Sequence, residues 1–161
     1  MSLNISGFNF TEQINKGALL SVIKADGKVN TMTVSWGTSG VLWNKKVVTV
    51  FVRPQRYTYE FCEESDIFTL SFFGEERKAT LTYCGTKTGR DVDKFKECGL
   101  KYEAKNGACI FEDAAITFVL KKLYRQELNG ECFLDKEPLK NYKDGDFHIA
   151  YTCEIIDTII K

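Results

Sequence analysis

The chain carries the stretch LLSVIKADGKVNTMTVSW at residues 19–36, and this stretch decides the predicted fold. Leu19–Ile23 is a short apolar run, Ala25–Lys28 has the composition of a tight turn, and Asn30–Trp36 alternates its side-chain types among β-branched residues. Together the three segments predict a β-hairpin. The chain is therefore expected to be built on antiparallel strands.

The segments on either side continue this pattern around a helical insertion. Further strands are expected at Val47–Val52, Ile67–Phe73, Ala108–Phe111, Ala115–Leu128 and Phe147–Ile160, and short helices at Gln55–Glu64 and Glu75–Cys84. A break in the strand pattern is expected at Gly37–Gly40, and a helix C-terminal cap at Gly85. A third short helix is expected to begin with a Thr88–Asp91 capping box and to end at Gly99. A hairpin turn is expected at Asn129-Gly130, followed by a strand at Glu131–Leu134. The predicted fold class is mainly β: a closed or partly open antiparallel β-barrel with peripheral helices.

Composition limits the kind of protein. A length of 161 residues fits one domain over residues 1–161, and 22 basic and 22 acidic residues cancel, so no overall field favours nucleic acid or an anionic membrane. No leader-like segment or membrane-length apolar window is present in the sequence, so a cytoplasmic protein is expected. The six cysteines are at least eleven positions apart and there is one histidine, which predicts buried thiols in a reducing compartment and no metal site.

Two stretches have the composition of phosphate-binding loops: RPQRYT at residues 53–58, directly behind an apolar run, and GTKTGRD at residues 85–91. Each places cations and hydroxyls where a helix is expected to begin, and a helix start offers free amide hydrogens and a positive dipole end. If both serve one anion, they form a phosphate socket suited to a nucleotide-type cofactor. The alternative is that Arg53 and Arg56 form surface ion pairs with acidic residues. The second stretch lacks the Walker pattern, and the chain has no dinucleotide Gly-x-Gly-x-x-Gly motif.

Two further features leave alternatives open. In the strand Thr31–Trp36, one face carries Thr31, Thr33 and Ser35, which predicts either a solvated sheet face or a polar edge that hydrogen-bonds a planar heterocycle. His148 could donate a proton or a hydrogen bond to a ligand, or it could be structural. No Ser-His-Asp order accompanies it.

Five motifs in order resemble the flavin reductase-like, flavoredoxin-type family: Asn30–Trp36, Arg53-Pro54-x-Arg56-Tyr57-Thr58, Ser71-Phe72-Phe73, Gly85–Asp91 followed by Asp93-Lys94, and His148-x-x-Tyr151-x-x-Glu154-Ile155. The resemblance covers nearly the whole chain. It implies an FMN-binding split β-barrel that forms homodimers, with the flavin held noncovalently near the subunit interface.

Carried over to this sequence, the resemblance implies a flavin ring along Thr31, Met32, Thr33, Val34, Ser35 and Trp36. The residues implied around the ribityl phosphate are Arg53, Arg56, Tyr57, Thr58, Lys87, Thr88, Gly89 and Arg90. His148 matches the position that faces the flavin or the incoming nicotinamide, and Cys153 stands where many relatives have glycine.

The function that the resemblance implies is an FMN-dependent oxidoreductase that takes electrons from NAD(P)H and reduces free flavin or another small acceptor. An electron carrier of flavoredoxin type, which exchanges electrons with protein partners, is an alternative. A non-redox module that stores or senses FMN is another. The expected partners are NAD(P)H or a protein electron donor and a second copy of the chain, with no nucleic acid and no membrane.

Overall fold

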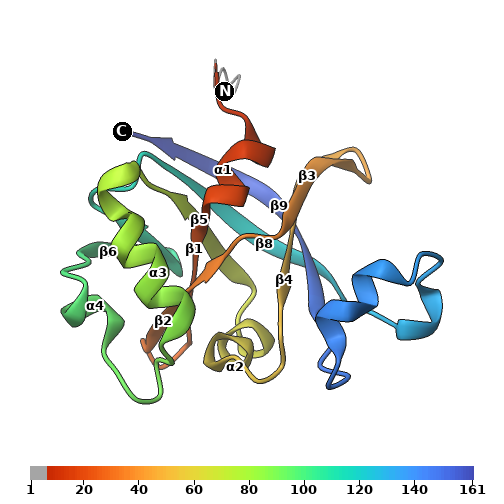
Figure 1. Ribbon diagram of the computed structural model, residues 1–161. Helices are drawn as coiled ribbons and strands as arrows, with labels where there is room; N and C mark the ends of the chain where they lie inside the picture. The colour runs from red at the N-terminus through yellow and green to blue at the C-terminus, as the bar shows by residue number, and fades with distance from the viewer. Residues whose placement is uncertain (1–6) are drawn as a thin grey trace.

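The computed structural model describes residues 7–161, and a seven-stranded antiparallel sheet forms its frame (Figure 1). The strand order is β2-β1-β5-β8-β9-β4-β3. These strands are β1 (Ala18–Ile23), β2 (Val29–Val34), β3 (Gly37–Leu42), β4 (Lys45–Val52), β5 (Ile67–Phe72), β8 (Ile116–Glu127) and β9 (Ile149–Ile160). A separate hairpin joins β6 (Tyr102–Lys105) to β7 (Ala108–Phe111).

Short helices surround the sheet. They are α1 (Phe10–Lys16), α2 (Tyr57–Glu64), α3 (Lys78–Thr86) and α4 (Lys94–Glu97), with 3-10 turns η1 (Glu75–Arg77), η2 (Gly130–Cys132) and η3 (Glu137–Tyr142). None of the helices in the described part of the chain has the length and apolar character needed to span a membrane.

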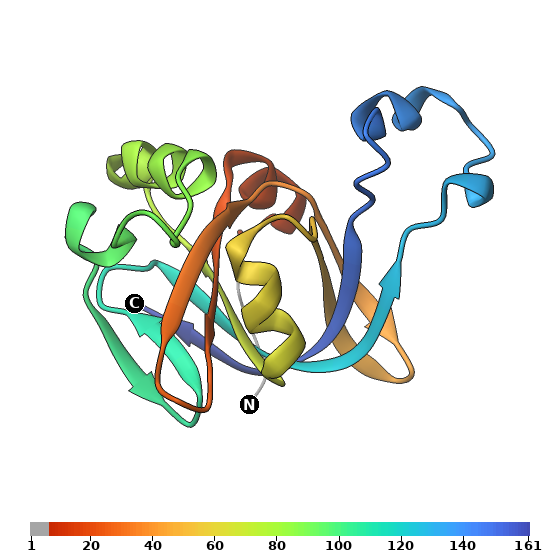
Figure 2. The same ribbon diagram turned by 90° about the horizontal axis from the view of Figure 1, so that it is seen from below.

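The sheet curls around one apolar core. Figure 2 shows β2 and β4, the strands on either side of the opening, with α2 between them. Leu70, Val50 and Tyr151 from three strands pack in this core with Phe61 from α2. The expected barrel with peripheral helices is confirmed.

A second apolar cluster lies on the outer side of β1. Leu19 of β1 packs there with Leu81 of α3 and Phe111 of β7, whereas Leu20 points into the barrel core. Since both faces of β1 are covered, its sequence is a continuous apolar run rather than a strict alternation.

Most predicted strands and the helix after Arg56 are confirmed, but Gly37–Gly40 is not a break. These residues begin β3, an exposed edge strand that pairs with β4. The prediction was wrong because an edge strand with both faces in water needs few apolar residues.

The boundaries near Gly85 were also predicted wrongly. Gly85 lies inside α3, which continues to Thr86, and a Cβ on Gly85 would lie 3.3 Å from the Cβ of Thr33, so its small size lets the helix approach β2 closely. Thr88 does not cap the next helix. Instead, the Asp93 carboxylate accepts hydrogen bonds from the amides of Phe95 and Lys96 and begins α4.

The expected hairpin at Asn129-Gly130 is absent, and the strand at Glu131–Leu134 is not formed. The Asn129 side chain accepts a hydrogen bond from the Glu131 amide and begins a 3-10 turn. Residues 128–148 then leave the barrel (Figures 1 and 2), and β8 instead pairs with β9. The local turn signal of Asn-Gly was satisfied by a different turn.

Candidate functional site

A cavity of about 180 Å³ lies beside the end of β2, and we call it the β2 cavity. Its wall is formed by β2 and the two residues after it, the end of β4 and the residue after that strand, the N-cap of α2 and the residue before β9. The lining residues are Met32, Thr33, Val34, Ser35, Trp36, Phe51, Arg53, Arg56 and His148.

β2 presents free backbone groups along one edge because it pairs only with β1. In an antiparallel pair, the amide and carbonyl of one residue point to the same side, and they alternate along the strand. The carbonyl of Thr31 faces away from β1, since it accepts a hydrogen bond from Lys94 Nζ at 2.8 Å. The backbone of Thr33, two residues further on, therefore also points to the open edge, where it can hydrogen-bond a ligand.

His148 is held at the cavity by aromatic neighbours and a hydrogen bond. Its Nδ1 lies 2.8 Å from the Tyr142 hydroxyl, and its ring centroid lies 5.3 Å from that of Trp36. Burial, and next to it the charge of Arg53, lowers the pKa of His148 from 6.5 to about 4, so the imidazole is neutral at pH 7. Burial also raises the pKa of Tyr142, so its phenol keeps its proton at pH 7. Either the phenol or Nδ1 can donate in this hydrogen bond, according to the imidazole tautomer.

Arg53 and Arg90 are engaged in ion pairs. Arg53 pairs with Asp146 and donates to the carbonyl of Asn141 at 2.9 Å, and Arg90 pairs with Glu60. The surface ion-pair alternative thus holds for Arg53, and Arg90 behaves in the same way. Both pairs remain partly exposed to solvent.

Arg56 and Lys94 have different partners. Arg56 Nη1 donates to the carbonyl of Gly85 at 2.9 Å, and Lys94 Nζ donates to the carbonyl of Cys84 at 2.9 Å. Burial lowers the pKa of both groups, that of Lys94 to about 8. Within residues 7–161, no carboxylate forms an ion pair with either cation. The end of α3 therefore holds two neighbouring positive charges that lack a protein counter-charge.

The two predicted phosphate loops lie against each other. Arg90 Nη1 donates to the carbonyl of Gln55 at 3.4 Å, and its guanidinium lies 4.8 Å from the ring centroid of Tyr57. Gly89 packs so closely that a Cβ there would lie 2.2 Å from Asn30 Oδ1. The convergence of two distant segments is confirmed by this geometry, whereas their common anion remains a prediction.

The polar face predicted for Thr31, Thr33 and Ser35 is divided: the hydroxyls of Thr31 and Thr33 are bonded within the protein, whereas Ser35 is exposed and lines the β2 cavity. The Thr31 hydroxyl accepts a hydrogen bond from Ser21 at 2.8 Å and donates to the carbonyl of Leu20. The Thr33 hydroxyl donates to the carbonyl of Leu81 in α3. Because these two hydroxyls are used inside the protein, β2 offers a ligand its free backbone edge rather than the hydroxyls of Thr31 and Thr33.

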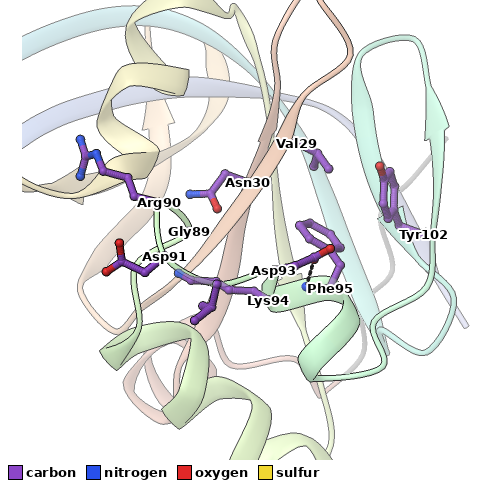
Figure 3. A pocket seen from close by; sticks show the side chains of 10 residues that line it. Val29, Asn30, Gly89, Arg90, Asp91, Asp93, Lys94, Phe95 and Tyr102 are labelled. Carbon is purple, nitrogen blue, oxygen red and sulfur yellow. Dashed lines mark hydrogen bonds between the residues drawn. The ribbon is translucent and has the colours of Figure 1, made fainter.

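The predicted site residues are divided among three places. Met32, Thr33, Val34, Ser35, Trp36, Arg53, Arg56 and His148 line the β2 cavity. Gly89 and Arg90 line a second, larger cavity of about 610 Å³ (Figure 3). Thr31, Tyr57, Thr58, Lys87 and Thr88 line neither cavity.

Several residues of the site were not predicted to belong to it. Phe51 alternates with core residues of β4, so its pattern pointed to no cavity, and Lys94 stands in one of the five family motifs but was given no role at the site. Tyr142 and Asp146 lie in the excursion that was predicted wrongly. Cys153 is buried and pairs regularly with Val48, and burial raises the pKa of its thiol to about 12.

Comparison with known proteins identifies the family. Residues 15–134 match the Flavin reductase like domain, and the chain belongs to this family. No curated protein matches the chain significantly in sequence.

Solved structures share the fold at low identity. An FMN-binding protein from Thermus thermophilus with bound p-hydroxybenzaldehyde is 20% identical, with a TM-score of 0.71 over 90% of this chain and 71% of that one. The flavoredoxin of Desulfovibrio vulgaris (Miyazaki F) is 19% identical, with a TM-score of 0.71 over 90% and 69% of the two chains. The styrene monooxygenase flavin reductase of Pseudomonas putida S12 is 17% identical, with a TM-score of 0.65 over 89% and 78%. The predicted split-barrel fold is confirmed.

Proposed function

We propose that the chain binds FMN at the β2 cavity and acts as an oxidoreductase that passes electrons from NAD(P)H to free flavin or another small acceptor. One observation carries the proposal: the cavity joins a free strand edge and a neutral histidine to a loop pair that holds uncompensated positive charge. Family membership and the FMN-binding proteins among the structural neighbours support it.

The donor set fits the phosphate end of FMN. Arg56 carries a charge with no ion-pair partner among the described residues, and Lys87 is exposed and likewise forms no ion pair there. A phosphate can therefore bind these two cations without displacing a carboxylate. At Arg53 and Arg90 it would compete with Asp146 and Glu60. We assign the phosphate to Arg56 and Lys87 first, with Thr58, Thr88 and the Gly89 backbone beside them.

The ring end would lie along the open edge of β2. The backbone of Thr33 supplies donor and acceptor groups for a heterocycle, and Trp36 and Phe51 exclude water from one side. His148 is neutral at pH 7, so it can hydrogen-bond a ligand but does not serve as an acid. When bound, FMN supplies the hydride and electron transfer chemistry, and the protein contributes position and hydrogen bonds.

We also propose that the protein forms homodimers. At the tip of the β3–β4 hairpin, Val41 is 76% exposed to solvent and Trp43 is 55% exposed. The Trp43 ring contacts that of Tyr124 in β8, which is also exposed. Exposed apolar side chains that gather in one place are typical of subunit interfaces. Sedimentation equilibrium should give twice the chain mass. A Val41→Glu, Trp43→Glu variant should sediment as a monomer, and a wild-type monomer at every concentration would contradict the proposal.

A cytoplasmic location is also part of the proposal. All six cysteines are free thiols, which is typical of a reducing compartment. Fractionation of the native host is expected to recover the protein in the cytoplasm, and recovery outside it would contradict this part.

Anaerobic reduction tests the proposed reaction. FMN is added to the purified protein, excess flavin is removed, and NADH or NADPH is mixed in by stopped flow while the flavin absorbance is recorded. Rapid bleaching of bound flavin is expected. If bound FMN is reduced only by a protein donor, the electron carrier is the correct alternative, and if no donor reduces it, a storage or sensing role remains. A folded protein that takes up no FMN contradicts all three.

A further inference from the structure

The larger cavity, of about 610 Å³, adjoins the proposed flavin site and shares Gly89 with it, but its side formed by Phe95 and Tyr102 has no role assigned above. It lies between the loop from Gly89 to Phe95, the start of β2 and Tyr102 of β6 (Figure 3). We call it the α4 cavity. Its volume falls within the range of about 300–1,000 Å³ that small-ligand sites occupy.

The two sides of the α4 cavity differ in chemistry. Figure 3 shows Arg90, Asp91 and Lys94 toward one side and Phe95 and Tyr102 toward the other. The rings of Phe95 and Tyr102 contact each other, with centroids 5.1 Å apart, and form an aromatic wall. Aromatic side chains of this kind stack against nucleobases.

The polar side matches a sugar and a phosphate. Lys94 is 3% exposed, and two of its three ammonium hydrogens are used by the carbonyls of Thr31 and Cys84, which leaves one donor. The Asp91 side chain is exposed and forms no ion pair within residues 7–161, whereas the Asp93 carboxylate is occupied by the amides of α4. A free carboxylate beside a nucleotide is suited to accept hydrogen bonds from the hydroxyls of a ribose and to repel a 2′-phosphate.

The α4 cavity and the β2 cavity lie along the same edge of β2. Asn30 lines the first and Met32–Trp36 line the second, while Lys94 binds the Thr31 carbonyl between them. At a rise of about 3.3 Å per residue, Asn30 and Ser35 are about 17 Å apart along the strand. A ligand that fills both cavities must be extended and must carry its charge near the middle, which describes a dinucleotide.

We propose that the α4 cavity binds the adenosine 5′-phosphate half of a dinucleotide, with adenine against Phe95 and Tyr102 and an unphosphorylated ribose at Asp91. This inference rests on the proposed function, because the adenosine 5′-phosphate would lie beside the loop that is assigned to the flavin phosphate. The adenylyl group can belong to FAD or to NADH. The carboxylate at residue 91 favours these two over NADPH.

Calorimetric titration of the FMN-loaded protein with ADP tests the proposal. ADP is expected to bind, and adenosine 2′,5′-bisphosphate to bind more weakly. Tyr102→Ala should weaken ADP binding at least about fivefold through lost stacking. The matched control Tyr83→Ala removes a half-buried tyrosine of α3 that does not line this cavity and should leave ADP binding unchanged. Asp91→Asn changes an exposed side chain and should reduce the difference in affinity between ADP and adenosine 2′,5′-bisphosphate. This variant tests the proposal even if Tyr102→Ala does not fold.

The outcomes separate this inference from the proposed function. If FMN binds and ADP does not, or if Tyr102→Ala and Tyr83→Ala behave alike, the α4 cavity proposal is wrong while the flavin site stands. If FMN itself does not bind, the proposed function fails. Two further titrations identify the source of the adenylyl group. If FAD binds the flavin-free protein more tightly than FMN does, and Tyr102→Ala loses this difference, the source is FAD. If NAD⁺, which cannot reduce the flavin, binds the FMN-loaded Tyr102→Ala variant more weakly than the FMN-loaded wild type, the source is the nicotinamide dinucleotide.

Discussion

Replacing Gly89 by alanine tests whether the contact between the two loops depends on the absence of a side chain. A Cβ at this position would lie 2.2 Å from Asn30 Oδ1 and 3.1 Å from a ring carbon of Tyr57. Asn30 is only 4% exposed and donates a hydrogen bond to the Thr58 hydroxyl at 2.9 Å, so it cannot turn away without losing this bond. Overpacking costs about 1–3 kcal/mol and a lost hydrogen bond about 0.5–1.5 kcal/mol. Because one movement causes both losses, we expect Gly89→Ala to lower the free energy of unfolding by about 2 kcal/mol.

Urea unfolding of Gly89→Ala measures this loss against a matched control. Gly40→Ala places a methyl group in β3 where no atom lies within 4 Å, so its stability should stay within about 0.5 kcal/mol of the wild type. On an Asn30→Ala background the clash is gone, and the cost of Gly89→Ala should fall. The steric account is refuted if Gly89→Ala is as stable as Gly40→Ala, or if its cost is the same on both backgrounds.

Three further predictions concern the charges and the histidine. Arg56→Ala and Lys87→Ala should each weaken FMN binding by about 1.5–3 kcal/mol in a fluorescence titration, whereas the exposed Lys46→Ala should not; unchanged affinity in both site variants would refute the phosphate assignment. The folded pKa of His148 is about 4 against 6.5 when unfolded, so the unfolded state binds more protons and stability is lost as the pH falls from 6.5 to 4. The free energy of unfolding of the wild type should fall by about 3 kcal/mol over this pH range, and this fall should be absent in His148→Gln. Equal pH profiles of the two proteins in urea unfolding would contradict the prediction. Tyr142→Phe removes the hydrogen bond to Nδ1, and it should slow flavin reduction more than it weakens FMN binding, whereas equal rates would make the contact purely structural.

The barrel could be predicted because its strands carry strong local signals. β1 and β4 are apolar runs too short for free-standing helices, and the turn at Ala25–Lys28 specifies the first hairpin. β3 could not be predicted, since an exposed edge strand has no buried face to mark it. The segment after Asn129 was misread because the same Asn-Gly pair suits a hairpin turn and the start of a 3-10 turn.

The candidate site was predicted in outline only. The positions of cations and glycines in the two loops indicated an anion site, and the structure brings those loops together. The partners of the cations depend on the tertiary fold: Asp146 reaches Arg53 from a distant excursion, and Lys94 reaches the edge of β2 from α4. No local pattern in the sequence specifies these contacts.

A comparison of FMN with riboflavin tests the central claim most directly. The two flavins share the ring and the ribityl chain and differ in the phosphate, so the ratio of their dissociation constants isolates the contribution of the loop pair. With one charge-assisted contact worth about 1.5–3 kcal/mol, riboflavin should bind at least about tenfold more weakly than FMN. A folded protein that binds both flavins equally, or binds neither, would contradict the account.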